Sequence, residues 1–233
     1  MTEAWAVIVA GGSGSRFSST QDKLLVPVAG KPVLQRTLEA FLATSDIAGI
    51  VLVAASDALE TYQTLVQTAF PMPRVPVLLT SGGSTRRDSV YQGLLALPQN
   101  VDLVAIHDAA RPLITPDLIT ATMHAVLQGA AGAILGLPIV DTVKSLDPAT
   151  GHIRNTIDRN TLWRAQTPQT FRREIIVKAH QMVPAETPVT DDAQLLELAG
   201  LGPILPIPGD ERNLKVTTPP DIQRAEAFLA GSP

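Results

Sequence analysis

The sequence predicts an α/β protein built on a doubly wound, mostly parallel sheet. Three observations support this fold class: apolar runs alternate with amphipathic stretches, the runs are rich in β-branched residues, and glycine turns or polar residues follow several of them. Parallel strands that are covered on both faces are continuously apolar, as Val7, Ile8 and Val9 are. We expect residues 1–233 to form a single domain that can bury a sizeable core.

The alternation gives a definite order of elements. The helix over residues 115–129 has the clearest signals, because Thr115 is a favoured N-cap, Pro116 suits the first helical position and Gly129 suits the end. The expected strands cover residues 7–9, 50–54, 75–79, 103–107, 132–138 and 203–207. The expected helices cover residues 32–43, 58–69, 85–96, 115–129, 172–182 and 191–199, and a last one begins at Thr218-Pro219.

A glycine-rich turn follows the first strand, in Ala6-Val-Ile-Val-Ala-Gly-Gly-Ser-Gly-Ser-Arg-Phe17. Glycines let the backbone approach a ligand closely, and the N–H groups of such a turn suit phosphate. Arg16 and Lys23 add two positive charges. Neither the Walker A motif nor the dinucleotide fingerprint fits, since no Gly-Lys-Ser/Thr closes the run and Phe17 stands where a third glycine belongs. We interpret the turn as a nucleoside triphosphate cradle; an ordinary strand-to-helix connection is the alternative.

A second glycine turn, Ser81-Gly-Gly-Ser-Thr-Arg-Arg-Asp-Ser89, precedes the helix over residues 85–96. It also follows a predicted strand, and ligands in a doubly wound sheet bind at the carboxyl ends of the strands. Its main-chain groups and the Ser89 hydroxyl suit a nucleobase and its ribose. The alternative is an ordinary helix cap with exposed arginines.

Asp108 ends another predicted strand, in His107-Asp-Ala-Ala-Arg-Pro112. A carboxylate there can hold Mg²⁺ against a triphosphate, because Mg²⁺ prefers hard oxygen ligands. Asp108 could otherwise cap the next loop or pair with Arg111. We expect His107 to be a strand-end residue rather than a base, because phosphate-monoester oxygens are already nucleophilic at neutral pH.

Residues 139–163 break the alternating pattern. The segment is polar, contains turn signals at Asp147-Pro148 and Thr150-Gly151, and lacks a long periodic helix. A loop of this length in a compact domain is usually functional or docks elsewhere. We therefore expect residues 139–163 to form a β-arm that projects from the domain.

Composition excludes several classes of function. The net charge of −4 argues against a nucleic-acid-binding surface built on overall positive charge. The absence of cysteine excludes disulfides and thiolate catalysis, and it fits the cytoplasm. The acidic start does not resemble a signal peptide, and no apolar stretch is long enough to cross a bilayer. We expect a cytoplasmic protein without nucleic-acid or membrane partners.

Taken together, these motifs resemble those of the 2-C-methyl-D-erythritol 4-phosphate cytidylyltransferases, enzymes of the non-mevalonate isoprenoid pathway with a Rossmann-like nucleotidyltransferase fold. The resemblance covers nearly the whole chain. Its most specific segment is Asp158-Arg-Asn-Thr-Leu-Trp163, whereas many nucleotidyltransferases share the first glycine loop. The other matching segments are residues 82–89 and 107–112, Asp141-Thr-Val-Lys144, Gln166-Thr-Pro-Gln169, Thr190-Asp191 and Asn213-Leu-Lys-Val-Thr217.

The resemblance implies a reaction and a set of site residues. The sugar phosphate attacks the α-phosphorus of CTP in line, pyrophosphate leaves, and 4-diphosphocytidyl-2-C-methyl-D-erythritol forms. Mg²⁺ is the implied cofactor, with Asp108 as its candidate ligand. The implied catalytic residues are Arg16, Lys23, Asp108 and Lys215. The implied CTP-binding residues are Ala10, Gly11, Gly12, Ser13, Gly14, Gly83, Ser84, Ser89 and Ala109. The implied substrate-binding residues are Arg111, Thr142, Arg159, Thr167 and Thr190.

The family also implies a homodimer with arm exchange, in which residues 139–163 serve dimerisation. Thr142 and Arg159 then reach from the arm into the partner subunit's site. The site would therefore be completed only by a second copy of the chain.

Asp22 departs from the family pattern. The family usually has Pro-Lys at positions 22–23, whereas Gln21-Asp-Lys-Leu-Leu25 is more similar to molybdenum-cofactor nucleotidyltransferases, which the arm and the C-terminal motifs do not fit. Ribitol-5-phosphate cytidylyltransferase is a closer alternative, although residues 141–144 and 158–163 favour methylerythritol phosphate. A non-catalytic nucleotide-binding protein on the same fold is a third, opposed by the presence of all four implied catalytic residues.

Overall fold

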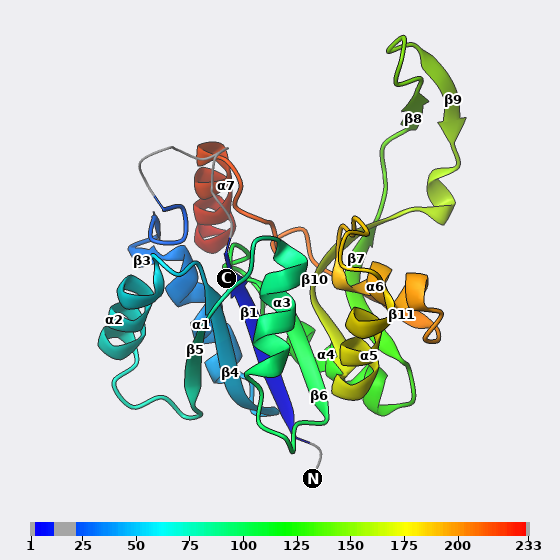
Figure 1. The fold of residues 1–233 in the computed structure, drawn as a ribbon. Helices are drawn as coiled ribbons and strands as arrows, with labels where there is room; N and C mark the ends of the chain where they lie inside the picture. The colour runs from blue at the N-terminus through cyan, green and yellow to red at the C-terminus, as the bar shows by residue number, and fades with distance from the viewer. Residues whose placement is uncertain (1–2, 12–21, 232–233) are drawn as a thin grey trace.

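The computed structural model describes residues 3–11 and 22–231, in which seven strands form one large sheet (Figure 1). The strands of this sheet are β1 (Ala4–Ala10), β4 (Ile47–Ala54), β5 (Val77–Ser81), β6 (Leu103–Asp108), β7 (Gly132–Pro138), β10 (Trp163–Arg172) and β11 (Ile204–Pro208). Their order is β11-β7-β10-β6-β1-β4-β5. Strand β10 runs antiparallel to β6 and β7, and the other neighbours pair in parallel. The predicted mostly parallel sheet is confirmed.

Helices cover both faces of the sheet, as a doubly wound fold requires. Strand β1 is buried along its whole length, and its residues alternate between two core clusters. The helices are α1 (Val33–Ala43), α2 (Leu59–Ala69), α3 (Arg86–Leu95), α4 (Pro116–Leu127), α5 (Arg173–Met182), α6 (Asp192–Ala199) and α7 (Pro219–Ala230). Ile8 packs in the cluster with α1, α2, α4 and α7, and Val7 packs in the cluster with α3, α5 and α6.

The helix starts follow the capping signals of the sequence. The Thr115 side chain accepts a hydrogen bond from the Leu118 N–H, and Pro116 is the first residue of α4, as predicted. Thr85 and Asp88 form a capping box at the start of α3, which satisfies backbone donors that the first turn leaves unpaired. No helix among residues 3–11 and 22–231 is both long and apolar enough to span a membrane.

Strand β10 was not predicted, although it lies in the middle of the sheet between β6 and β7. Its sequence, Trp163-Arg-Ala-Gln-Thr-Pro-Gln-Thr-Phe-Arg172, lacks the apolar run of a buried strand. Pro168 falls within an irregular register between Ala165 and Gln169, where a missing N–H can be tolerated. The buried side chains of β10 are largely polar and form hydrogen bonds with neighbouring segments. The strand therefore has no apolar periodicity by which the sequence could have revealed it. The strand predicted at residues 75–79 also lies slightly later, at Val77–Ser81.

A short hairpin that was not predicted follows the first glycine loop. It pairs β2 (Pro27–Val28) with β3 (Lys31–Pro32), immediately before α1. Ala29 and Gly30 turn the chain with positive φ values of 45° and 79°.

The predicted projecting arm is confirmed. Strands β8 (Val143–Leu146) and β9 (Ile153–Ile157) pair as an antiparallel hairpin, and a short 3₁₀ helix, η1 (Arg159–Thr161), leads back into β10. Figure 1 shows this hairpin extending from the ends of β7 and β10, away from the layers of helix and sheet. The predicted arm ends where β10 begins, at Trp163.

Candidate active site

The motifs that follow strands meet at one edge of the sheet. Asp108 is the last residue of β6 and lies beside Val9 of β1, so it is close to the start of the first glycine loop. The second glycine turn follows β5, and its Gly82 N–H donates to the Ala54 carbonyl at the end of β4. The carboxyl ends of parallel strands are where ligands bind in such sheets.

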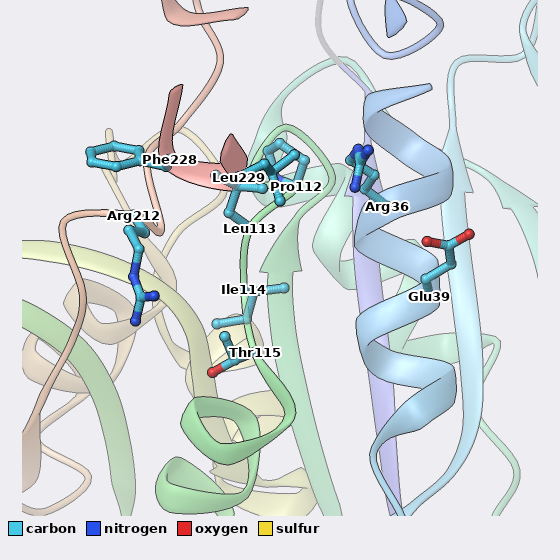
Figure 2. Close-up of a pocket in the computed structure, with 9 residues that line it drawn as sticks. All are labelled: Arg36, Glu39, Pro112, Leu113, Ile114, Thr115, Arg212, Phe228 and Leu229. Carbon is cyan, nitrogen blue, oxygen red and sulfur yellow. The ribbon is translucent and has the colours of Figure 1, made fainter. Parts of the chain in front are cut away.

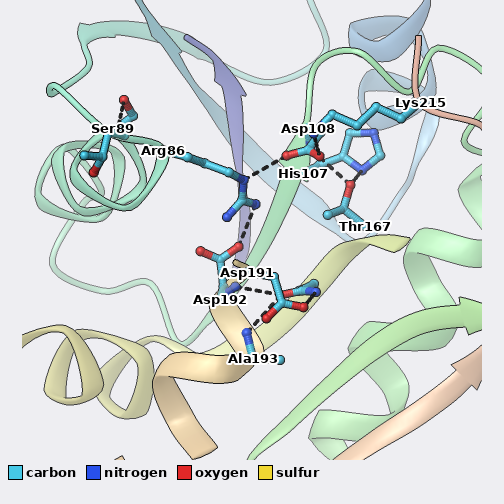
Figure 3. A network of polar contacts seen from close by, with 11 residues as sticks. Arg86, Ser89, His107, Asp108, Thr167, Asp191, Asp192, Ala193 and Lys215 are labelled. Atoms are coloured by element: carbon cyan, nitrogen blue, oxygen red, sulfur yellow. Dashed lines mark hydrogen bonds and ion pairs between the residues drawn. The ribbon is translucent and has the colours of Figure 1, made fainter. Parts of the chain in front are cut away.

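Asp108 is held between two cations, which are far from it in sequence (Figure 3). Arg86 Nε donates to Asp108 Oδ1 at 3.1 Å, and Lys215 Nζ donates to Asp108 Oδ2 at 2.7 Å. Burial alone would raise the pKa of Asp108, but the charges of Arg86 and Lys215 outweigh burial and hold the pKa well below its usual range. The carboxylate is therefore ionised at neutral pH. Arg86 and Lys215 are the hydrogen-bonded partners of the Asp108 carboxylate, and the charge of Arg111, the partner considered from the sequence, also lowers the pKa of Asp108.

Arg86 bridges Asp108 to the start of α6. Its Nη2 donates to Asp192 Oδ2 at 2.8 Å, and the Asp192 residue is 1% exposed. Burial raises the pKa of Asp192, against the charge of Arg86. Gln169 of β10 fixes this end of α6, because its Oε1 accepts from the N–H groups of Asp192 and Ala193, each at 3.0 Å.

Arg86, Asp192 and Gln169 were missed as candidate site residues. The helix cap of the alternative interpretation is present at Thr85, but the expectation that the two arginines are exposed is wrong. Arg87, 9% exposed, donates to the carbonyls of Val183 and Pro184 beyond α5, at 2.5 and 2.6 Å. The sequence did contain a signal for such partners. Arg86 and Arg87 stand in the first turn of α3, where a cation opposes the helix dipole unless carboxylates or carbonyls offset its charge.

Thr167 joins His107 to the backbone of Asp108. The Asp108 N–H donates to Thr167 Oγ1 at 3.1 Å, and Thr167 Oγ1 lies 3.1 Å from His107 Nδ1. His107 Nε2 lies 3.4 Å from the Arg111 carbonyl, which can only accept, so in the neutral ring Nε2 carries the proton and Nδ1 accepts from Thr167. Burial lowers the pKa of His107 to about 3, which keeps the ring neutral. This arrangement agrees with the expectation that His107 is a strand-end residue rather than a base.

Arg111 and the segment around Lys215 are tied together. Arg111 Nη1 donates to the Asn213 carbonyl at 2.7 Å, and the Val216 N–H donates to the Ala110 carbonyl at 2.8 Å. Asn213 is fully buried, and its Nδ2 donates to the Thr167 carbonyl at 2.9 Å. These contacts hold the segment before α7 against the end of β6, which brings Lys215 to Asp108.

The second glycine turn is packed tightly on α3. A Cβ at Gly82 would lie 2.6 Å from Ser89 Oγ, and one at Gly83 would lie 2.3 Å from Asp88 Cβ, so side chains are excluded there. Ser89 Oγ accepts from the Gly83 N–H at 3.2 Å and donates to the Thr85 carbonyl at 2.9 Å. The Ser84 hydroxyl donates to Asp88 Oδ2 at 2.8 Å. Both hydroxyls shape the turn, and their contact with a nucleoside stays a prediction.

The first glycine loop lies partly outside the described residues. Gly11 follows Ala10 at the end of β1, and a Cβ at Gly11 would lie 3.5 Å from Ser89 Oγ, so the two glycine turns are neighbours. The Ala109 N–H donates to the Val9 carbonyl at 3.0 Å, which places it at the same edge. Gly12, Ser13, Gly14 and Arg16 lie outside the described residues.

Thr190 lies near this edge, whereas the two arm residues do not. Thr190 Oγ1 donates to Gln194 Oε1 of α6 at 3.1 Å, two residues before Asp192. Thr142 is exposed on the arm, and Arg159 Nη1 donates to the Val140 carbonyl at the base of the arm. The chain therefore does not bring Thr142 and Arg159 to its own Asp108.

A separate cavity of about 200 Å³ lies between α1, α7 and the segment that leads into α4 (Figure 2). Arg36 donates to the Val28 and Ala29 carbonyls, and Arg212 pairs with Asp210. The cavity contains none of the predicted site residues. Its lining residues are Arg36, Glu39, Pro112, Leu113, Ile114, Thr115, Arg212, Phe228 and Leu229.

Comparisons with known proteins give one family. The family model IspD, 2-C-methyl-D-erythritol 4-phosphate cytidylyltransferase, matches residues 4–231. An enzyme of that name from Synechocystis is 42% identical over 96% of this chain and 95% of its own length. A bifunctional IspD/IspF enzyme from Clavibacter michiganensis is also 42% identical, and this chain spans 54% of its length.

A solved structure extends the agreement to three dimensions. The 4-diphosphocytidyl-2C-methyl-D-erythritol synthase of Anaerococcus prevotii superposes with a TM-score of 0.85 at 29% identity, covering 98% of this chain and 99% of that one. The nucleotidyltransferase fold predicted from the sequence is thereby confirmed. The chain belongs to the 2-C-methyl-D-erythritol 4-phosphate cytidylyltransferase family.

Proposed function

We propose that this chain transfers CMP from CTP to 2-C-methyl-D-erythritol 4-phosphate, giving 4-diphosphocytidyl-2-C-methyl-D-erythritol and pyrophosphate for the non-mevalonate isoprenoid pathway. The observation that carries the proposal is the pairing of Lys215 with Asp108 beside two glycine turns, in a chain of this family. A cation held by a carboxylate at the nucleotide edge of the sheet is suited to an incoming phosphate.

The proposed mechanism is positioning and charge stabilisation. An oxygen of the sugar phosphate attacks the α-phosphorus in line, and pyrophosphate leaves. Two anions must meet, so Arg16, Lys23 and Lys215 would hold the phosphates and stabilise the charge of the transition state. The attacking oxygen needs no general base, which is compatible with a neutral His107 that is already hydrogen-bonded.

The substrate pocket would lie beside Lys215. The Asp108 cluster is defined as Asp108, Arg86, Lys215, Asp192, Thr167 and His107. Arg111 lies beside it and donates to the Asn213 carbonyl. We propose that Arg111, Thr167 and Thr190 bind the methylerythritol phosphate. The main-chain groups of the two glycine turns, with Ala109, would bind cytosine and ribose.

Mg²⁺ belongs to the proposal as the ion that neutralises triphosphate charge. Among residues 3–11 and 22–231, no group of three or more carboxylate or histidine side chains could hold a metal. Mg²⁺ commonly uses one or two carboxylates together with substrate phosphates and waters, so Asp108 alone fits this pattern. A carboxylate offers about four lone-pair positions, so contacts with Arg86 and Lys215 leave room for a metal.

We also propose a homodimer in which the arms are exchanged. Val140, Leu146 and Ile153 are 71%, 56% and 65% exposed on the arm, and exposed apolar side chains in one region favour an interaction surface. A partner's arm would bring the Thr142 and Arg159 that each chain's own Asp108 cluster lacks. The cytoplasmic location and the absence of nucleic-acid and membrane partners stay predictions.

The test is pyrophosphate release with Mg²⁺ and CTP, comparing 2-C-methyl-D-erythritol 4-phosphate with ribitol 5-phosphate. We expect turnover with the first acceptor alone, and none when ATP or GTP replaces CTP. Turnover only with ribitol 5-phosphate would keep the mechanism and reject the pathway. No pyrophosphate from any pair, in a folded protein that binds CTP, would leave a nucleotide-binding protein without catalysis.

A further inference from the structure

Asp22, the residue that departs from the family pattern, is held by a tyrosine of α2. Tyr62 Oη donates to Asp22 Oδ2 at 2.6 Å, across 40 residues of sequence. The Tyr62 residue is 2% exposed and its ring packs in the core shared by α1 and α2. Burial and then the Asp22 carboxylate raise the pKa of Tyr62 above its usual value, so the hydroxyl stays protonated and donates. A buried tyrosine hydroxyl needs a polar partner, and Asp22 supplies it.

The other oxygen of Asp22 shapes the turn that contains Lys23. Asp22 Oδ1 accepts from the Leu24 N–H at 2.9 Å, and the Asp22 carbonyl accepts from the Leu25 N–H at 3.0 Å. An aspartate that bonds the backbone two residues on forms an Asx turn, which restricts the residue between them. Asp22 therefore connects α2 to the turn at Lys23.

The far side of Lys23 is fixed as well. Leu24 is 4% exposed in the core, and its carbonyl accepts from the Leu34 N–H of α1 at 2.9 Å. The backbone of Lys23 therefore lies between two attachments, the Tyr62–Asp22 pair on one side and the buried Leu24 on the other. Only the first depends on side-chain hydrogen bonds that a conservative substitution can remove.

We propose that Tyr62 and Asp22 are positioning residues that set the position of Lys23 in the turn that follows the first glycine loop. This inference rests on the proposed function, in which Lys23 holds the CTP phosphates. Lysine is a point charge on a flexible stem, so its reach depends on where its backbone is held. A misplacement of about 1 Å can cost as much as 10²-fold in rate.

A double-mutant cycle between Tyr62→Phe and Lys23→Met tests the inference. The readouts are kcat/KM for CTP and the Kd of CTP by calorimetry with Mg²⁺. We expect Tyr62→Phe to lower kcat/KM about tenfold in the wild-type background and less than about twofold in the Lys23→Met background, because the pair acts through Lys23. The Kd of CTP should show the same pattern.

Matched variants separate positioning from folding. Tyr91, the chain's other tyrosine, stacks on His180 and lies outside this turn, so Tyr91→Phe should leave kcat/KM unchanged. Asp22→Asn removes one of the two acceptor oxygens, and combined with Tyr62→Phe it should add little. If Tyr62→Phe unfolds, the Asp22→Asn cycle with Lys23→Met replaces it.

An effect of Tyr62→Phe that is equal in both backgrounds, or absent from both, would overturn the inference. A wild-type chain that binds CTP without turnover would reject the proposed function, and the Kd cycle would still decide the role of the pair. A wild-type chain that neither turns over nor binds CTP would overturn both.

Discussion

The Asp108 cluster and the arm are built in opposite ways. In the cluster, Asp108, Asp192 and His107 are buried. Their hydrogen-bond partners come from the start of α3, from β10 and from the segment before α7. In the arm, β8 and β9 are bonded mainly to each other, and Leu146 and Ile153 are more than half exposed. The first region is prearranged within one chain, whereas the second presents its residues outward.

This difference shows how the work of the site is divided. Charges that must meet a phosphate need fixed partners, because a preorganised site does not have to reorganise during the reaction. Thr142 and Arg159 lie on the arm, where the Arg159 side chain donates to the Val140 carbonyl at the base of the arm. The cluster should therefore be sensitive to single substitutions within one chain, and the arm should depend on a second copy.

The largest effect is expected at the cluster, from Lys215→Ala. The substitution removes a cation that would hold the α-phosphate, so we expect kcat to fall by about 10²–10³. Steady-state kinetics with both substrates saturating measures it. Lys178→Ala, at an exposed position of α5, is the matched control and should leave kcat unchanged. A fall of less than about tenfold for Lys215→Ala would remove Lys215 from the mechanism.

The arm can be tested by mixing two inactive variants. We expect Arg159→Ala alone to lose about 10² in rate, since it deletes one charged contact. If arms are exchanged, a dimer of one Arg159→Ala chain and one Lys215→Ala chain has one intact site. Random pairing then restores about a quarter of wild-type activity. A mixture that stays as inactive as its parents, although chains exchange, would show that each arm serves its own chain.

Much of the cluster could be predicted because strand ends are visible in sequence. The glycine turns and Asp108 each follow an apolar run, and parallel strand ends must meet at one edge. Lys215 could be placed only by family resemblance, since it comes from a short segment that the Arg111–Asn213 contact folds back onto β6. Its proximity to Asp108 is a tertiary contact that no local pattern encodes.

Strand β10 and Arg86 show where sequence reasoning fails. Strand β10 carries Gln166, Thr167 and Gln169 inside the sheet, and polar side chains at buried positions look like a loop until their partners are known. Arg86 looked exposed for the same reason, because its two carboxylate partners lie 22 and 106 residues away. Buried polar networks are satisfied by distant residues, so their members are hidden from periodicity.

A smaller effect, confined to the cluster, is expected from Arg86→Lys. The guanidinium bridges Asp108 and Asp192 with two nitrogens, and an ammonium cannot reproduce that planar fork. We expect kcat to fall about tenfold through misplacement of Asp108 and Lys215. The neighbouring Arg87→Lys is the control, because it loosens the chain after α5 and should lower Tm while kcat is retained. If Arg86→Lys lowers Tm as much as Arg87→Lys does and leaves kcat unchanged, the bridge between Asp108 and Asp192 has only a structural role.

The smallest expected effect is on the pH dependence of the free energy of unfolding, which should change for a substitution in the cluster and not for one in the arm. His107 in the cluster has a pKa lowered to about 3 by burial, against about 6.5 in an unfolded chain. Between these values the unfolded chain binds a proton that the folded chain does not, so the free energy of unfolding falls as pH falls. From pH 7 to 5.5 His107 should contribute about 1 kcal/mol to this fall. Urea unfolding of His107→Gln should lack that contribution, whereas His152→Gln on the arm should retain it, because that variant leaves His107 and its buried surroundings unchanged. Equal pH dependence in wild type and His107→Gln would mean that the ring accepts a proton within the folded cluster, and Thr167 Oγ1 would then accept from Nδ1–H instead of donating to Nδ1.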